Sequence, residues 1–405
     1  MECRFRIARL MSVCFAVLLA LCAVAPNAMA QSEAKVRPRK PVVQMDRGSF
    51  HNHLKSLGYK THGSIAKSKT NQDSDGDGGD GRARSLPHFS SSFTVGGVTY
   101  PFTMVGHQPR SGRSTRIPSI IVPLRMHFVF FGPNQDVNVD FDPTPAVNNI
   151  LNSPIFNDAS FANGIGQFND MMQRATFWNK MDPGRQWHVR WSQPRVFHPV
   201  DIEVTPETGT LFQDADGNFF GDVLFDFMDA EIQTIIELTG MDPDEVPIFV
   251  TDGVTNEALG YHSAFTVTGQ GGKEAFQTFI FSSWLDPALV DPLFADISTL
   301  NHEAGELIND PFINNIVPDW RYPPESDPRA TCSFNPFLEV GDPQGNGATF
   351  DDFPTVVVSA NNTNYHLQDL VMLPWFADEV PSSAENGWYD FPATTDITAP
   401  AVYCQ

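Results

Sequence analysis

The segment from Asn301 to Asp310 holds the residues of this sequence with the most distinctive chemistry. His302, Glu303 and Glu306 form a His-Glu-x-x-Glu pattern, which is the HExxH arrangement with a carboxylate in place of the second histidine. Residues four apart on a helix lie one turn above each other, so His302 and Glu306 can bind one metal ion. Glu303 can reach a water molecule beside that ion as general base. The alternative interpretation is an ordinary solvated helix face.

The helix that carries this pattern is predicted over Pro292–Asn309. Asp291 can cap its start, and proline suits the first turn. Apolar residues recur mostly at spacings of three and four and predict one buried stripe: Leu293, Ile297, Leu300, Ala304, Leu307 and Ile308. His302 and Glu306 lie off that stripe, where side chains from elsewhere in the fold can join them.

A third metal ligand must come from outside this pair, and three downstream acids are candidates. Glu339 and Asp342 stand in the run LEVGDP, where Gly341 allows the chain to approach an ion closely. Asp310 has an ordinary alternative role, because the run NDP is typical of a helix end. We favour Glu339 as the ligand, with Asp342 either supporting another ligand or binding the metal itself.

These motifs resemble those of a group of secreted, largely uncharacterised proteins with an HE-x-x-E-x-x-x-D-P helix and a downstream E-[IV]-G-D turn. The plant exordium, or phosphate-induced, family looks like a distant member of that group. Matching segments include GYH at 260–262, FQTFIF at 276–281 and YHLQDL at 365–370, so the resemblance covers the chain from about Phe93 onward. It implies a zincin-like fold with four residues at its centre: His302, Glu303, Glu306 and Glu339.

The metal expected at this centre is divalent. One neutral imidazole and two carboxylates would cancel its charge and acidify a bound water less than three histidines do. We expect zinc. Manganese or calcium would suit an oxygen-rich site, above all if Asp342 or Asp310 also binds.

Three further residues could stabilise an oxyanion or fix a ligand: His262, Tyr365 and His366. Each stands beside an aromatic neighbour, and an ordinary half-buried, hydrogen-bonded side chain is the alternative. We retain Tyr365 and His366 as candidate catalytic residues.

The first thirty residues have the pattern of a cleavable secretory signal. Three arginines precede an apolar run from Leu10 to Val24, and small residues surround Met29. That run is short for a bilayer span, and no later stretch reaches the roughly eighteen apolar residues that a span requires. We therefore expect a secreted or periplasmic protein with no membrane span in the mature chain.

The charge balance is strongly acidic, with a formal net charge of −22 at pH 7. Loss of residues 1–30 removes one acid and three arginines, which takes the charge to −24. A field of this sign repels phosphates, so we expect no nucleic-acid partner.

Two cysteines remain once Cys3, Cys14 and Cys22 leave with the signal. In an oxidising compartment, a disulfide between Cys332 and Cys404 is the simplest expectation. A two-cysteine metal site is the less favoured alternative, because zinc cysteines are usually closely spaced.

Residues 31–87 are polar, with little to bury, and predict a disordered leader or linker. Asp73, Asp75 and Asp77 match the start of an EF-hand loop, but Arg84 stands where calcium needs a glutamate. Residues 88–405 are rich in Phe, Val, Ile and Pro, and predict one zincin-like domain with a substantial core.

Within that domain, the predicted elements indicate an α+β fold: a zincin-like mixed sheet with an active-site helix and additional β structure. Strands are predicted at 93–102, 117–131, 187–191, 246–250, 264–267 and 275–282. Two further helices are predicted over Ile165–Trp178 and Val223–Leu238. The run DADGN at 214–218 predicts a hairpin turn, with a cation site as the alternative.

The leading functional hypothesis is a metal-dependent hydrolase, above all a peptidase acting on peptide or protein substrates, with Glu303 as general base. The alternative is a non-catalytic exported surface or cell-wall protein in which the same centre holds a structural ion. Glu303 discriminates the two hypotheses, because a structural site needs ligands but no free base beside them.

Overall fold

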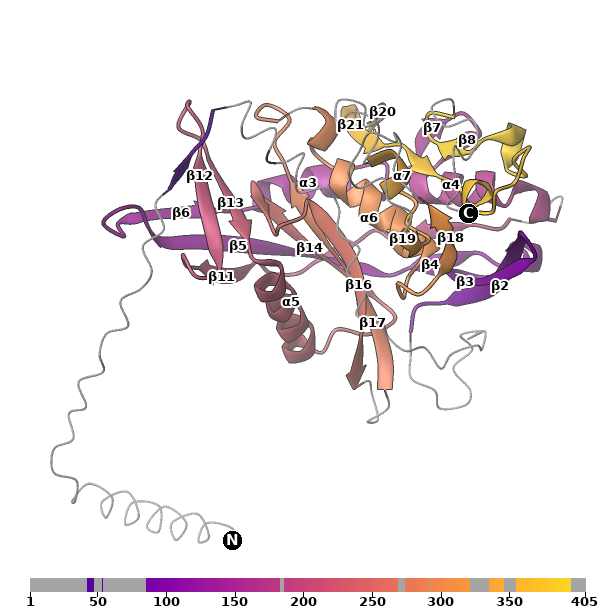
Figure 1. Cartoon of the computed structure of the whole chain (residues 1–405), viewed down its shortest axis with the longest axis horizontal. Coiled ribbons are helices and arrows are strands. Elements are labelled where there is room, and N and C mark those ends of the chain that lie inside the picture. The colour runs from indigo at the N-terminus through magenta and orange to yellow at the C-terminus, as the bar shows by residue number, and fades with distance from the viewer. Residues whose placement is uncertain are drawn as a thin grey trace, which may run out of the picture. The chain divides into compact units, whose positions relative to one another are not determined.

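Strand β5 (Ser119–Phe131) belongs to the main sheet and pairs with several other strands. Its β-branched and aromatic residues favour a buried, extended chain. The structure is a computed structural model (Figure 1) that describes residues 42–46, 53, 85–182, 186–268, 274–290, 292–320, 335–345 and 355–394. These residues belong to one unit, Arg39–Gln405. Helices and strands both occur along it, so the predicted α+β class is confirmed.

The main sheet is mixed, and its strands lie in the order β10, β5, β14, β17, β16. The partners of β5 in this order are β10 (Arg195–Val196), β14 (Val246–Asp252), β17 (Glu274–Trp284) and β16 (Gly260–Thr268). The first four strands are parallel, whereas β16 is an antiparallel edge strand. The far half of β5 also pairs with β11 (Val200–Val204) and β6 (Val137–Phe141).

Side-chain alternation along these strands directs side chains into two different cores, one on each face of the main sheet. Ile248 and Ile280 project into the core that holds helix α6 (Ser298–Asn309). The neighbouring Phe249 projects to the opposite face, into the core that holds helix α5 (Phe225–Thr239). Figure 1 accordingly shows α6 and α5 on opposite sides of β14, β16 and β17. The alternation therefore decides which residues of the edge strand can meet α6.

Helix α6 is buried along its whole length and on all sides. The predicted apolar stripe is present, since Leu300, Ala304 and Leu307 lie in the core. The side that carries His302 and Glu306 is buried as well, because strand β21 (Thr363–Gln368) and the turn around Gly341 pack against it. The motif helix is therefore interior rather than half-exposed.

The predicted helix over Pro292–Asn309 is wrong at its start. A short 3₁₀ turn at Pro292–Phe294 is separated from α6 by Asp296, whose φ of 47° lies in the left-handed region. The Asp296 N–H donates to the carbonyl oxygen of Leu285 at 2.9 Å, and a helix cannot run through a residue bonded in this way. Asp291, predicted to cap the helix, lies outside the described residues.

The other elements surround this framework. The helices are α3 (Thr144–Leu151), α4 (Phe168–Thr176), α7 (Asp342–Gly345) and α8 (Leu373–Phe376), with 3₁₀ turns at Pro109–Ser111, Trp178–Lys180 and Glu385–Gly387. The paired strands are β2 (His88–Val95) with β3 (Val98–Val105), β4 (Thr115–Ile117) with β9 (Val189–Trp191), β7 (Ala159–Phe161) with β8 (Gly164–Gly166), β18 (Ile316–Trp320) with β19 (Asn335–Phe337), β20 (Thr355–Ala360) with β21, and β22 (Leu370–Val371) with β23 (Asp390–Phe391). A second sheet has the order β1 (Val43–Gln44), β12 (Gly209–Gln213), β13 (Phe219–Val223), β15 (Val254–Thr255).

Most of the locally signalled elements are confirmed. Each predicted strand has a counterpart, and the hairpin turn at 214–218 joins β12 to β13. Predicted helices over 165–178 and 223–238 correspond to α4 and α5 with shifted ends.

Strand β1 corrects the prediction that residues 31–87 are a disordered leader throughout. Val43 pairs with Phe212 of β12, so this part of the segment adds a strand to the second sheet. Several predicted features lie outside the described residues: the signal at 1–30, the acids at 73–77, Cys332 and Cys404.

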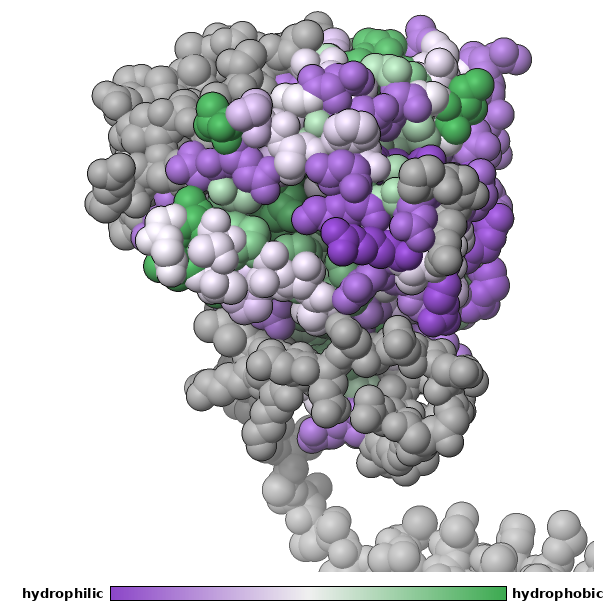
Figure 2. All heavy atoms as spheres, turned by 90° about the vertical axis from the view of Figure 1, so that its right-hand side faces the viewer, coloured by the Kyte–Doolittle hydropathy of each residue, from purple (hydrophilic) through white to green (hydrophobic). Residues whose placement is uncertain are grey.

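Among the described residues, no helix has both the length and the apolar character that a membrane span needs. On the face drawn in Figure 2, polar and intermediate side chains predominate, and apolar ones form small separate groups. The largest of the fully buried side chains include Trp187, Trp191 and Trp320, whereas Trp178 is exposed.

Candidate metal centre

Two groups of side chains that could hold a metal ion meet between α6 and the edge of the main sheet. One is His302, Glu306 and Asp342, and the other is His262, Glu303 and Glu306. In each group, one ligand atom per residue lies within 4.8 Å of the others. Glu306 belongs to both groups, which therefore form one continuous polar centre inside the protein.

The first group combines one turn of α6 with the start of α7. His302 Nε2 lies 3.0 Å from Glu306 Oε1, as the i,i+4 spacing predicts. Asp342 approaches from α7, with its Oδ1 3.8 Å from the same nitrogen. The sequence predicted His302 and Glu306 as a ligand pair, and the structure places Asp342 beside them.

Gln368 orients the ring of His302. The Gln368 Nε2 group donates to the carbonyl oxygen of Gly341 at 2.7 Å, so its Oε1 faces His302 Nδ1 as an acceptor at 3.0 Å. A proton on Nδ1 leaves Nε2 directed at the carboxylates. This is the arrangement by which a neighbouring acceptor fixes the tautomer of a metal-binding histidine.

Gly341 allows the downstream turn to lie directly against the His302 ring. A Cβ atom at this position would stand 2.3 Å from His302 Nδ1, well inside contact distance. The Gly341 N–H also donates to Glu306 Oε1 at 3.1 Å. The close approach expected of this glycine is therefore an approach to the ligands themselves.

The second group is completed by His262 of the edge strand β16. His262 pairs with Ile280 in the sheet register, which puts its side chain on the α6 face. Its Nδ1 lies 3.3 Å from Glu303 Oε2 and 3.5 Å from Glu306 Oε2. Its Nε2 faces the carbonyl oxygen of Asp310 at 3.2 Å, so this ring too has an acceptor on its far side.

Glu339, predicted as the third ligand, is buried close to both groups. It is 1% exposed, and neither carboxylate oxygen has a hydrogen-bond partner among the described residues. Burial and the nearby Glu306 raise the pKa of Glu339 well above its usual range. A buried carboxylate with no donor is stable only with a proton or a cation, so Glu339 indicates positive charge at this centre.

The pKa shifts of the other residues show that the carboxylates and imidazoles of the centre interact strongly. Burial by itself would lower the pKa of His302, but the facing carboxylates of Glu306, Glu303 and Asp342 raise it to about 9. Burial would raise the pKa of Glu306, but the imidazoles of His302 and His262 lower it overall. For Glu303 burial dominates, and its pKa is raised. If the imidazoles were uncharged and the carboxylates ionised, the buried centre would carry negative charge that no described side chain compensates.

A divalent cation fits the donor set of the first group. Two ligands bound to one ion at about 2.1 Å stand roughly 3.0–3.5 Å apart, depending on the coordination angle. The separation of 3.0 Å between His302 Nε2 and Glu306 Oε1 lies in this range, and that of 3.8 Å to Asp342 is slightly longer. The orphaned carboxylate of Glu339 adds a further oxygen donor nearby.

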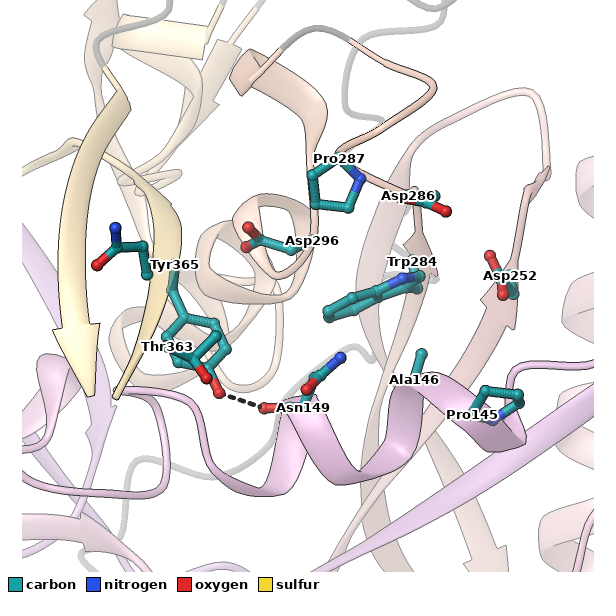
Figure 3. A pocket seen from close by; sticks show the side chains of 11 residues that line it. Pro145, Ala146, Asn149, Asp252, Trp284, Asp286, Pro287, Asp296, Thr363 and Tyr365 are labelled. Atoms are coloured by element: carbon teal, nitrogen blue, oxygen red, sulfur yellow. Dashed lines mark hydrogen bonds between the residues drawn. The ribbon is translucent and has the colours of Figure 1, made fainter. Parts of the chain in front are cut away.

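Tyr365 and His366, the other predicted catalytic residues, have their contacts elsewhere. Tyr365 Oη donates to the carbonyl oxygen of Asn149 at 3.0 Å, and His366 Nδ1 lies 2.6 Å from Asp296 Oδ2. Figure 3 shows Tyr365 at a separate pocket of about 270 Å³, together with Asp296 and Trp284. The member of β21 that reaches the centre is Gln368.

The sequence pattern named His262 only as a residue that could fix a ligand, and it did not predict a role for Gln368. His262 has a recognisable signal, because it alternates with core residues of β16 and so must face either α5 or α6. Gln368 has no such signal, since its role depends on how β21 packs across the helix. Asp310 acts as the predicted helix end: its carboxylate accepts from the N–H groups of Asn314 and Asn315.

Comparison with protein-family models, curated proteins and solved structures finds no match to this chain. The resemblance of its motifs to the secreted group with an HE-x-x-E helix stays a prediction.

Proposed function

We propose that this protein is an exported, metal-dependent hydrolase with a zincin-like fold that acts on peptide or protein substrates. The observation that carries the proposal is the convergence of His302, Glu306 and Asp342, with Glu303 adjacent on α6. Zinc is the metal we propose, because it accepts mixed nitrogen and oxygen ligands. Export rests on the signal pattern of residues 1–30.

Glu303 is the residue proposed to move protons. A divalent cation held by His302, Glu306 and Asp342 would supply a Lewis acid that polarises a substrate carbonyl and makes water more acidic. Glu303 would accept a proton from the attacking water and pass it to the leaving amine. Its Oε1 has no hydrogen-bond partner among the described residues and so is available to a water molecule.

Burial favours a second candidate function, in which the ion is structural. The exposed fractions of the central residues are 0% for His302, 1% for Glu303, 4% for Glu306 and 2% for Asp342. A hydrolase must admit both water and a scissile bond to such a centre, so catalysis requires that the covering segments move. A structural ion needs no access and would hold α6, α7 and β21 together.

The experiment compares Glu303→Gln with wild type for metal content, melting temperature and hydrolysis of a diverse peptide library. Glu237→Gln, on the exposed side of α5, is the matched control. A hydrolase in which Glu303 lies outside the ligand set predicts stoichiometric metal and an intact fold in both variants, with activity lost only in Glu303→Gln.

Two results would decide against the hydrolase. Purified protein that contains no stoichiometric metal contradicts both candidates. Protein that contains metal, melts normally and cleaves no peptide in the library supports the structural ion instead. Removal of the ion with a chelator should then lower the melting temperature without any change in enzymatic behaviour.

A further inference from the structure

Glu306 presents its two carboxylate oxygens to two different histidines. Oε1 faces His302 Nε2 at 3.0 Å, and Oε2 faces His262 Nδ1 at 3.5 Å. Each ring has an acceptor at its other nitrogen, Gln368 Oε1 for His302 and the Asp310 carbonyl for His262. Both rings are therefore oriented in the same way, with one nitrogen turned toward carboxylates.

The separations around His262 are those of two ligands on one ion. Its Nδ1 lies 3.3 Å from Glu303 Oε2 and 3.5 Å from Glu306 Oε2. Nitrogen-to-oxygen hydrogen bonds are usually about 2.7–3.2 Å, whereas two ligands at about 2.1 Å from one ion stand roughly 3.0–3.5 Å apart. The second group therefore has the geometry of a cation site in its own right.

The charge of the centre is compatible with more than one divalent ion. Four carboxylates of the two groups and their surroundings are buried together: Glu303, Glu306, Glu339 and Asp342. A fifth buried carboxylate, that of Asp310, accepts from the N–H groups of Asn314 and Asn315 and is left out of this count. One divalent ion balances two of them, and an unbalanced carboxylate in a dry interior is strongly unfavourable. Two divalent ions balance all four, with both histidines neutral as ligands.

We propose that the centre is binuclear, with one ion at His302, Glu306 and Asp342 and a second at His262, Glu303 and Glu306. Glu306 bridges the two ions through its two oxygens, and Glu339 supplies a further donor. The second ion deepens the proposed function and rests on the same first ion. Centres of this kind hold their ions about 3.5–4 Å apart.

A second ion changes the part played by Glu303. Its Oε2 becomes a ligand, and only Oε1 stays available to a water molecule. Loss of the Glu303 carboxylate would then reduce metal content as well as any proton transfer, which a base outside the ligand set would not do.

Manganese provides the probe, because two neighbouring Mn²⁺ ions give an exchange-coupled electron paramagnetic resonance spectrum. Metal-depleted full-length protein is titrated with Mn²⁺, and bound equivalents and spectra are recorded for wild type, His262→Asn and the exposed control His198→Asn. We expect two equivalents with a coupled spectrum for wild type and the control. His262→Asn should bind one equivalent, with an uncoupled spectrum.

Each contrary result separates this inference from the proposed function. If wild type binds one equivalent and His302→Asn binds none, the proposal of a second ion is wrong and that of the first ion stands. Protons on His262 and on one carboxylate would then balance the charge. Two equivalents without coupling, unchanged in His262→Asn, place the second ion elsewhere and also overturn the inference. No bound ion at all overturns both. If His262→Asn does not fold, the count and spectrum of wild type still decide.

Discussion

His262 and Glu303 meet across two elements, with Nδ1 of the strand residue 3.3 Å from Oε2 of the helix residue although 41 positions separate them in the sequence. The contact links the edge of the main sheet to the motif helix. It also means that the acid at the second position of the HExxE pattern has a fixed partner. Any role of Glu303 must therefore be considered together with His262.

Gly341→Ala should damage both the fold and metal binding. The new Cβ would stand 2.3 Å from Nδ1 of the buried His302 ring. Rotation of that ring away from the Cβ would break its hydrogen bond to Gln368. Overpacking of this kind costs about 1–3 kcal/mol of unfolding free energy. Denaturant unfolding and metal titration measure the two effects. Gly217→Ala, where a Cβ meets nothing within 4 Å, should leave metal affinity unchanged.

Replacement of Gln368 should weaken metal binding more than it weakens the fold. Gln368→Leu removes the acceptor for His302 Nδ1 and the donor to the Gly341 carbonyl. Loss of such a supporting contact typically lowers metal affinity by about 10–100-fold. Gln368→Glu keeps an acceptor for the ring and should recover part of the affinity. Equal affinities in wild type and Gln368→Leu would mean that the contact of Gln368 with His302 does not support metal binding.

Much of the fold can be predicted from local sequence patterns, whereas only some residues of the candidate metal centre can. The hairpin at 214–218 depends on nearby residues, and so does the pairing of His302 with Glu306 along one helix face. Asp296 shows where a local signal fails: the helical period continues through it, but its bond to Leu285 comes from a strand end. The contribution of Gln368 depends on packing between β21 and α6, which no short pattern predicts.

Metal affinity should increase as the pH rises from 6 to 8. In the cation-free protein, facing carboxylates outweigh burial and raise the pKa of His302 to about 9, and that of His262 is raised as well. The His302 ring therefore carries its second proton at neutral pH, and an ion must displace that proton because imidazole binds metals in its neutral form. Each proton released changes the affinity by about tenfold per pH unit. Calorimetry in buffers of different ionisation enthalpy counts these protons, and a count of zero would contradict imidazole ligation.

Asp252→Asn should stabilise the protein at neutral pH but not in acid. Asp252 lines the pocket in Figure 3, where burial, and then Asp286 and Asp142, raise its pKa from 3.8 to about 6. The folded state thus binds this proton more tightly than the unfolded state does. The side chain consequently costs no stability below about pH 4, costs more as the pH rises from 4 to 6, and costs a constant amount above that.

The expected gain for Asp252→Asn at pH 7.5 is about 1–2 kcal/mol of unfolding free energy, because partial exposure reduces the value that the full pKa shift would give. At pH 4 the variant and wild type should unfold at nearly the same denaturant concentration. Asp216→Asn, at the exposed tip of the β12–β13 hairpin, is the control for the loss of one surface carboxylate. A stabilisation of Asp252→Asn that is equal at pH 4 and 7.5 would show that the ionised form of Asp252, disfavoured by burial and by Asp286 and Asp142, is not its cause.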